Sequence, residues 1–148
     1  MNHRARKRPR RSPAPDKLVF SLLRAAGEVE SRLEAALSPS GLSLAKLGLL
    51  RVLAEANEPL PLSELAQQQR CVRSNITQIV DRLEKDGLVR RRADADDRRS
   101  VRAGLTPAGE RAYARGMRAL AQAQRAIKSS LKSTDASSLQ AALETLAR

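Results

Sequence analysis

The sequence predicts a mainly α-helical protein that carries one small β-hairpin. Apolar residues recur every three or four positions along most of the chain, a spacing that gathers them on one face of a helix. Near residues 88–105, by contrast, two short apolar segments flank a charged loop, which is the pattern of a hairpin. The length of 148 residues, 41% of them hydrophobic, suits a single domain with a buried core.

The composition excludes several classes of function. The 28 Lys and Arg residues exceed the 16 Asp and Glu residues, and the formal charge of +12 makes nucleic acid the first partner to consider. One cysteine, Cys71, and one histidine, His3, provide neither a cysteine-rich zinc site nor a histidine base for a Ser-His or Cys-His mechanism. We therefore expect no enzymatic activity, no cofactor and no metal ion.

The N-terminal 16 residues are expected to form a disordered basic tail. They carry a net charge of +5, three prolines and almost no apolar side chains, so they cannot offset the entropy lost on ordering. Two interpretations remain open, a solubilising extension and an auxiliary arm that binds phosphates. The tail does not continue into the apolar region of a signal peptide, and no apolar run reaches the roughly 18 residues of a membrane span. The prediction is a cytoplasmic protein without a membrane partner.

Two helices are predicted after the tail. The first spans Lys17 to about Leu37 and ends where proline and glycine appear in residues 38–41. The second spans Leu44 to about Ala56, with Ser43 as its N-cap.

The middle of the chain predicts a short edge strand at residues 60–62, where proline is tolerated, and then a short helix capped by Ser63. A fourth helix is predicted from about Arg73 to Asp86, with Gly87 adopting the left-handed conformation that ends it. Its apolar residues keep helical spacing and are Ile76, Ile79, Val80 and Leu83.

A hairpin with an exposed tip of about seven residues is predicted next, followed by two helices. Thr106 is the expected N-cap of the fifth helix, with Pro107 at its first position. That helix is predicted to reach about Leu131. A last helix follows a cap within residues 133–135.

The order of these elements is that of a winged helix-turn-helix, here residues 60–106. In that fold the fourth helix enters the major groove of DNA, where base edges are distinguishable. The hairpin tip reaches the neighbouring minor groove, whose negative potential attracts arginine. Residues 70–102 carry a net charge of +4, which concentrates the basic charge where this fold places DNA.

Four segments at the right spacing resemble the MarR family of transcription regulators. They are Leu62–Ala66, Ser74–Glu84 with Gly87–Val89, Asp97–Arg99 and Leu105–Gly109. The resemblance covers about residues 17–148. It implies a homodimer formed by helices within 17–37 and 107–148, recognition of an inverted repeat in double-stranded DNA, and often a small-molecule effector that loosens DNA binding.

Carried over residue by residue, the resemblance also implies the DNA contacts. The recognition helix would present Arg73, Ser74, Asn75, Thr77, Gln78 and Arg82. In the wing, Arg99 would enter the minor groove, oriented by a charge-assisted hydrogen bond to Asp97. Four more arginines are interpreted as phosphate contacts, which position the domain without specifying sequence: Arg90, Arg91, Arg92 and Arg98. The remaining tip acids, Asp94 and Asp96, are expected only to solvate the loop.

Leucines of the first and last helices are predicted to form the dimer interface. These are Leu18, Leu22, Leu139, Leu143 and Leu146. An isolated apolar stripe at the end of a chain needs a partner surface, and palindromic DNA needs a two-fold protein.

The turn before the recognition helix departs from the family pattern at Gln69, Arg70 and Val72. Cys71 is interpreted as a small buried hydrophobe rather than a redox switch. Phe20 and Tyr113 are the only aromatic residues, too few for a typical aromatic-acid pocket, so the ligand is not identified.

Two functions follow from the sequence. The first is a homodimeric, sequence-specific DNA-binding regulator, a repressor relieved by a small molecule. The alternative is a nucleoid-type structural protein that binds DNA without sequence preference. The polar Asn75 and Gln78 favour the first function, and the basic tail favours the second.

Overall fold

The computed structural model describes residues 16–69, 73–94, 100–132 and 134–147. Its elements in chain order are α1 (Lys17–Leu37), a 3-10 turn (Ser38–Ser40), α2 (Leu44–Ala56), β1 (Leu60–Pro61), α3 (Leu62–Gln68), α4 (Arg73–Lys85), β2 (Val89–Ala93), β3 (Val101–Leu105), α5 (Pro107–Ser129) and α6 (Ala136–Leu146). The predicted fold class, mainly helical with a small hairpin wing, is confirmed.

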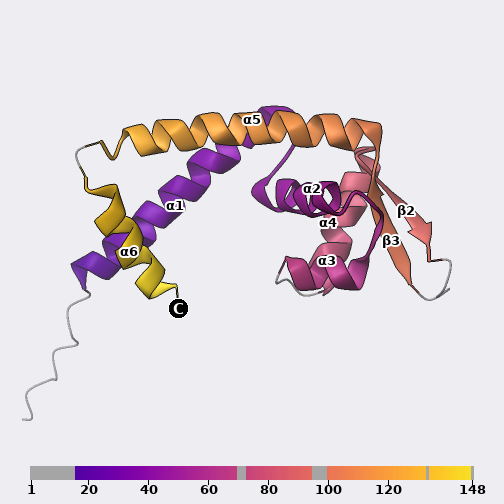
Figure 1. The fold of residues 1–148 in the computed structure, drawn as a ribbon, viewed down its shortest axis with the longest axis horizontal. Coiled ribbons are helices and arrows are strands. Elements are labelled where there is room, and N and C mark those ends of the chain that lie inside the picture. Colours follow the sequence, from indigo (N-terminus) through magenta and orange to yellow (C-terminus); the bar gives the residue numbers. More distant parts are fainter. Residues whose placement is uncertain (1–15, 70–72, 95–99, 133, 148) are drawn as a thin grey trace, which may run out of the picture.

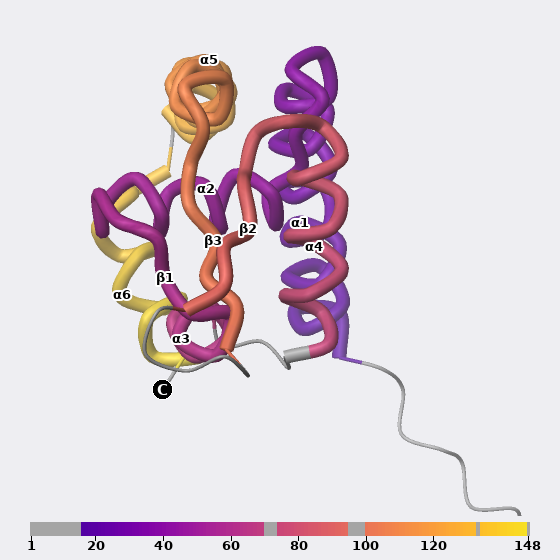
Figure 2. The backbone as a smooth tube through the Cα atoms, turned by 90° about the vertical axis from the view of Figure 1, so that its right-hand side faces the viewer, coloured from indigo at the N-terminus to yellow at the C-terminus, as the bar shows by residue number. Residues whose placement is uncertain are grey.

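The elements form an arch (Figure 1). Helix α5 runs along the top, α1 and α6 lie beneath one end, and α2, α3, α4 and the strands lie beneath the other. The strands make one antiparallel sheet in the order β1-β3-β2, with Leu60 opposite Ala103 and Val89 opposite Leu105. Figure 2 shows the strands side by side, with α4 next to β2. Proline is tolerated in β1 because that strand lies at the sheet edge.

Helix caps explain where the helices begin. Ser43 Oγ accepts a hydrogen bond from the Lys46 amide at 3.2 Å, and Thr106 Oγ1 accepts one from the Gly109 amide at 3.0 Å, both as predicted. Asp135 caps α6, and the hydrogen bond from the Ser138 hydroxyl, together with the amides of Ser138 and Ser137, lowers the pKa of its carboxyl.

The predicted cap at Ser63 is wrong. Helix α3 begins two residues earlier than this cap implies, at Leu62, and its N-cap is Pro61, which makes no side-chain cap. Pairing with β3 holds Leu60 and Pro61 in the sheet, and the extended backbone of Pro61 leads directly into the helix. The strand therefore sets the start of α3.

The core lies between α2, α3, α4 and the sheet, which together make up the winged domain. Leu49, Leu50 and Leu53 of α2 are fully or almost fully buried and belong to the same cluster as Leu65 of α3. The four predicted apolar residues of α4 are buried there too. Each such side chain contributes roughly 1.5–3 kcal/mol relative to an exposed position.

Two glycines let α5 approach the rest of the fold. A Cβ at Gly109 would collide with the carbonyl oxygen of Leu88, and one at Gly116 would lie 2.8 Å from side-chain atoms of Leu42 and Leu47. Helix α5 consequently packs closely on the winged domain along its first three turns.

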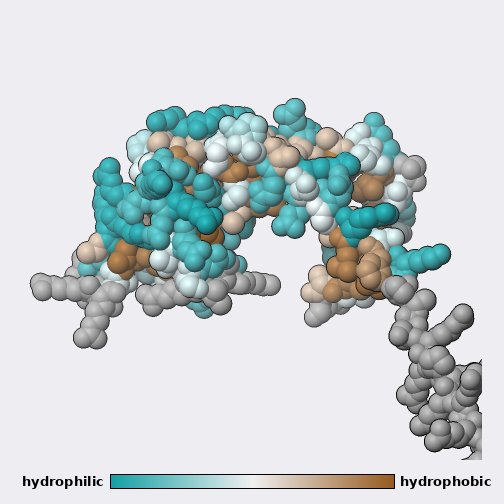
Figure 3. Space-filling view, turned by 180° about the vertical axis from the view of Figure 1, so that it is seen from behind, coloured by the Kyte–Doolittle hydropathy of each residue, from teal (hydrophilic) through white to brown (hydrophobic). Residues whose placement is uncertain are grey.

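Helices α1 and α6 leave apolar side chains uncovered. Leu37 is the buried residue of α1, and no residue of α6 is buried. Leu18 is 67% exposed and Leu146 is 70% exposed. Figure 3 shows an apolar patch at this end of the arch. None of the helices in the described residues has the length and apolar content of a bilayer span.

Candidate nucleic-acid interface

Helix α4 separates its apolar and polar residues onto opposite sides. Ile76, Val80 and Leu83 have no exposed surface. Five of the predicted recognition residues are exposed together on the other side: Ser74, Asn75, Thr77, Gln78 and Arg82. Arg73 is the first residue of the helix, as predicted. The helix therefore presents a row of hydrogen-bonding side chains over most of its length.

Arg91 of β2 fastens the wing to α4. Its guanidinium forms an ion pair with Asp81 and another with Glu84, whose Oε2 lies 3.3 Å from Nη1. The Arg91 amide donates to Glu84 Oε1 at 3.1 Å, and Nη2 donates to the Thr77 carbonyl oxygen at 3.3 Å. The Arg91 side chain is 27% exposed, so water screens these contacts less than at the open surface. We name this set of contacts the Arg91 clamp.

The clamp corrects the interpretation of Arg91 as a phosphate contact, because its guanidinium is already used within the domain. Because successive side chains of a strand point to opposite faces of the sheet, Arg90 and Arg92 lie on the face opposite Arg91. Arg90 and Arg92 are exposed, and both line a small surface pocket with Pro59 and Pro107. The role of these two arginines as phosphate contacts stays a prediction.

A second arginine holds the base of the wing tip. Arg102 Nε lies 2.7 Å from Asp94 Oδ2, and Arg102 Nη1 donates to the Pro59 carbonyl oxygen at 3.2 Å. Asp94 is only 9% exposed, and its amide donates to the Ser100 carbonyl oxygen. The expectation that Asp94 only solvates the tip is therefore wrong: it is a buried partner of Arg102.

The rest of the tip lies outside the described residues. This includes Asp96, Asp97, Arg98 and Arg99. Arg70, Cys71 and Val72 of the turn, and the tail up to residue 15, also lie outside them. Their predicted roles stay predictions.

Gln69, one of the departures from the family pattern, forms a hydrogen bond with α2. Its Nε2 donates to the Gly48 carbonyl oxygen at 2.9 Å. A Cβ at Gly48 would lie 3.1 Å from Gln69 Oε1, so the glycine gives the amide room. The isolated glycine within a helical pattern was the available sequence signal for this close approach.

Lys46 connects the start of α2 with the end of α4. Its Nζ lies 2.8 Å from Asp86 Oδ2 and donates to the Gly41 carbonyl oxygen at 3.2 Å. No local sequence pattern predicts this pair, because 40 residues separate its members.

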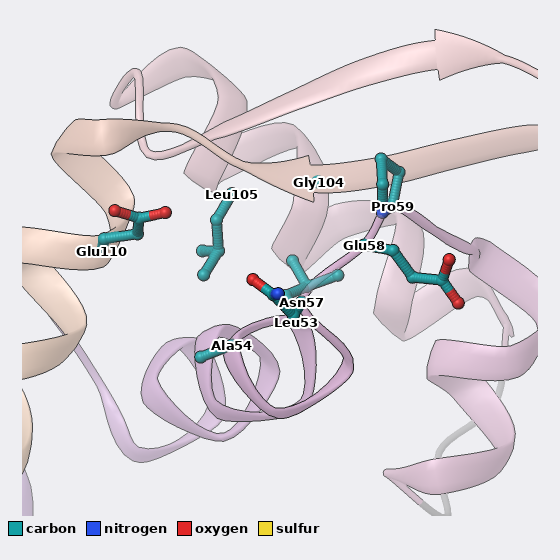
Figure 4. A pocket seen from close by; sticks show the side chains of 8 residues that line it. All are labelled: Leu53, Ala54, Asn57, Glu58, Pro59, Gly104, Leu105 and Glu110. Carbon is teal, nitrogen blue, oxygen red and sulfur yellow. The ribbon is translucent and has the colours of Figure 1, made fainter.

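Two concave regions flank this scaffold. A polar hollow of about 680 Å³ lies between α1, α2 and Arg82 of α4, with Glu34 and Lys46 in its wall. A second pocket of about 330 Å³ lies between the end of α2, β3 and the start of α5 (Figure 4). There Glu58 and Glu110 lie on opposite sides of Asn57, so their carboxylates do not converge. Within the described ranges no group of three or more His, Cys, Asp or Glu side chains could hold a metal ion.

We predict that Arg91→Ala lowers the free energy of unfolding by about 1 kcal/mol. It breaks a partly buried network and leaves Asp81 and Glu84 without their cation. The matched control is Arg90→Ala on the same strand, whose side chain is exposed; its expected effect is within about 0.5 kcal/mol. Urea unfolding followed by circular dichroism measures both. Equal losses in the two variants would contradict the clamp.

The sequence profile described as the MarR family matches residues 42–101 of this chain. The homoprotocatechuate degradative operon repressor of Escherichia coli is 29% identical over 113 residues, 76% of each chain.

Solved structures agree with the sequence matches. The transcriptional repressor CouR of Rhodococcus jostii RHA1, bound to a 23-mer DNA duplex, is 29% identical, with a TM-score of 0.76 over 88% of this chain and 92% of its own. The transcriptional regulator MOSR of M. tuberculosis, also bound to DNA, is 27% identical, with a TM-score of 0.69 over 88% and 93%. The exposed polar helix, the wing joined to it by Arg91 and these matches lead to one conclusion: in sequence and fold the chain is similar to the MarR family of transcription regulators.

Proposed function

We propose that this protein is a homodimeric repressor that recognises an inverted repeat in double-stranded DNA and is released by a small molecule. The observation that carries the proposal is the exposed polar face of α4, held at a fixed position relative to the wing by the Arg91 clamp. The repressor named among the relatives supports repression over activation.

The side chains of α4 suit base recognition in the major groove. Asn75 and Gln78 can pair bidentately with adenine, Arg73 and Arg82 with guanine, and Ser74 and Thr77 with either base. In the wing, Arg99 enters the minor groove with Asp97 as its orienting partner. Phosphate contacts from Arg90, Arg92 and Arg98 fix the register. Uncharged hydrogen-bonding groups on α4 are the feature that a non-specific nucleoid protein would not need.

The second copy of the chain covers the apolar side of α1 and α6. Besides Leu18 and Leu146, Leu143 is 47% exposed, and Leu22 and Leu139 are half-buried. Removing such a surface from water is the ordinary driving force of a stable dimer. A two-fold axis there would set two recognition helices roughly 34–36 Å apart, one turn of DNA. A dimer on its site then blocks transcription sterically.

The hollow between α1, α2 and α4 is the proposed effector site. Its wall carries two cations, Lys46 and Arg82, and serine hydroxyls, which suit a polar anion. An anion bound by Lys46 would compete with Asp86 and release the end of α4 from α2. Because this changes the position of α4 relative to α1, it lowers the affinity for a site of fixed spacing.

The decisive experiment for specificity is competition between selected genomic fragments and bulk DNA at moderate salt. We expect a preference of about 10³ or more for the selected site. Gln78→Ala and Arg99→Ala should each weaken specific binding by about 1–3 kcal/mol, whereas Arg92→Ala should weaken both kinds of binding alike. No preference for any fragment would favour the nucleoid alternative, and full affinity in Arg99→Ala would remove the wing contact.

The dimer is tested by Leu143→Glu, which places a charge in the apolar patch. We expect sedimentation of a monomer at micromolar concentration, because a buried unpaired carboxylate opposes association. The control is Val101→Glu, since Val101 is also an exposed apolar residue but lies on β3, away from α1 and α6. A wild-type protein that is monomeric at micromolar concentration would refute the proposal.

Effector action is tested by the distance between the two recognition helices. Spin labels at Lys85→Cys, in a Cys71→Ser background, report this distance by pulsed electron paramagnetic resonance. A compound that releases DNA should move the distance away from roughly 34–36 Å. An identical distribution with and without that compound would count against the mechanism.

A further inference from the structure

Helix α5 carries a row of arginines on the face opposite its packed side. Gly109, Ala112 and Gly116 are buried on the packed side. On the other side the spacing of four, three, four and three residues aligns five exposed side chains: Arg111, Arg115, Arg118, Gln122 and Arg125. We name the four arginines of this row the arginine ridge.

The positive charge of the arginine ridge is not neutralised by side chains of the described residues. None of its four guanidiniums takes part in an ion pair or side-chain hydrogen bond within the part of the chain that the structure describes. Two exposed arginines on other helices do pair at i,i+4, Arg32 with Glu28 and Arg51 with Glu55. On the other described helices an unpaired exposed arginine stands singly, as Arg24 does on α1 and Arg82 on α4, whereas α5 carries four in one row.

On α5 the acidic residue is Glu110, and its i+3 and i+4 neighbours are Tyr113 and Ala114 rather than arginines. Arg111 with Arg115, and Arg115 with Arg118, are instead like-charge neighbours that destabilise the helix. A face that served solubility alone would gain from alternating charges, so a row of one sign points to a polyanion.

We propose that the arginine ridge binds the phosphate backbone of a second DNA duplex, so that the protein bridges two DNA segments. Arg111 and Arg125 are 14 residues apart, or about 21 Å along the helix axis, which spans several phosphates. Guanidinium groups bind phosphate oxygens bidentately.

A protein partner fits the ridge less well. Hot spots in protein interfaces are enriched in Trp and Tyr as well as Arg and lie in desolvated pockets, and the row offers arginines and Gln122 without an aromatic or large apolar neighbour in line. The exposed Met117 lies off the row, more than a quarter of a turn around the helix. The surface therefore provides charge without an apolar anchor, which is what sequence-independent DNA binding requires.

The ridge and the recognition surface lie on opposite sides of the molecule. In Figure 1, α5 runs along the top, whereas α3 lies at the bottom and α4 between the two. Figure 3 shows hydrophilic side chains along the outer edge of α5. Because the packed side of α5 faces α2, the ridge faces away from the winged domain. One straight duplex cannot contact both surfaces, so the ridge takes a second one.

A bridging assay tests the proposal. A biotinylated duplex that carries a selected site is immobilised and loaded with protein, and retention of a labelled duplex of unrelated sequence is measured. Wild type should retain the labelled duplex, and retention should fall steeply with salt. Arg115→Glu should reduce retention about tenfold while affinity for the immobilised duplex changes less than about twofold. The matched control is Arg51→Glu, the same charge change on an exposed position of α2.

Other results of the bridging assay would contradict the proposal. Unchanged retention in Arg115→Glu, or an equal loss in Arg51→Glu, overturns the proposal. So does a parallel fall in affinity for the immobilised duplex, since the ridge would then contact the first duplex. Retention of labelled polyglutamate but not of DNA would assign the ridge to an acidic protein instead. If no selected site exists, two unrelated duplexes still test bridging, so failure of specific recognition is distinguishable from failure of the ridge.

Discussion

The proposed reading of DNA by this fold depends first on one interaction, the Arg91 clamp. A helix in the major groove and a hairpin tip in the next minor groove read one sequence only if their separation is fixed. Hydrophobic packing holds α4 on the core and holds the base of the wing there through Val89 and Ala103. Arg91 adds a direct polar link from β2 to α4 through two carboxylates and a backbone carbonyl.

The clamp also changes how the basic charge of the chain is understood. The sequence places a run of three arginines in β2, and net charge treats them alike. In the structure one arginine of the run is neutralised by α4, and Arg102 is neutralised by Asp94. Both pairings lie within residues 70–102, so the net +4 is unchanged, but two of the arginines in that range are used to hold the domain together. The charge available to DNA from the described strands comes from Arg90 and Arg92, which face away from Arg91.

Most of the fold could be predicted from the sequence because it depends on local signals. Helical periodicity and the caps Ser43 and Thr106 act within one turn, and both ends of α1 and α2 lie where they were expected. The features that the sequence did not predict are those set by contacts between residues far apart in the chain. Ser63 has the chemistry of a cap, but pairing of β1 with β3 moved the helix start. Likewise, the partners of Lys46 and Gln69 are set by tertiary packing, which no short window contains.

Helix α5 links the two ends of the arch, and its close packing constrains how a signal can pass between them. Gly109 and Gly116 leave no space for α5 to slide over Leu88 or Leu42 without a clash. The start of α5 must then move together with Leu88, Leu42 and Leu47. Helix α4 is not among the segments that the two glycines contact, and its end is joined to the start of α2 by Lys46 and Asp86. The hollow that contains Lys46 lies at this contact, so the proposed anion would act between α2 and α4, where the glycines impose no close approach.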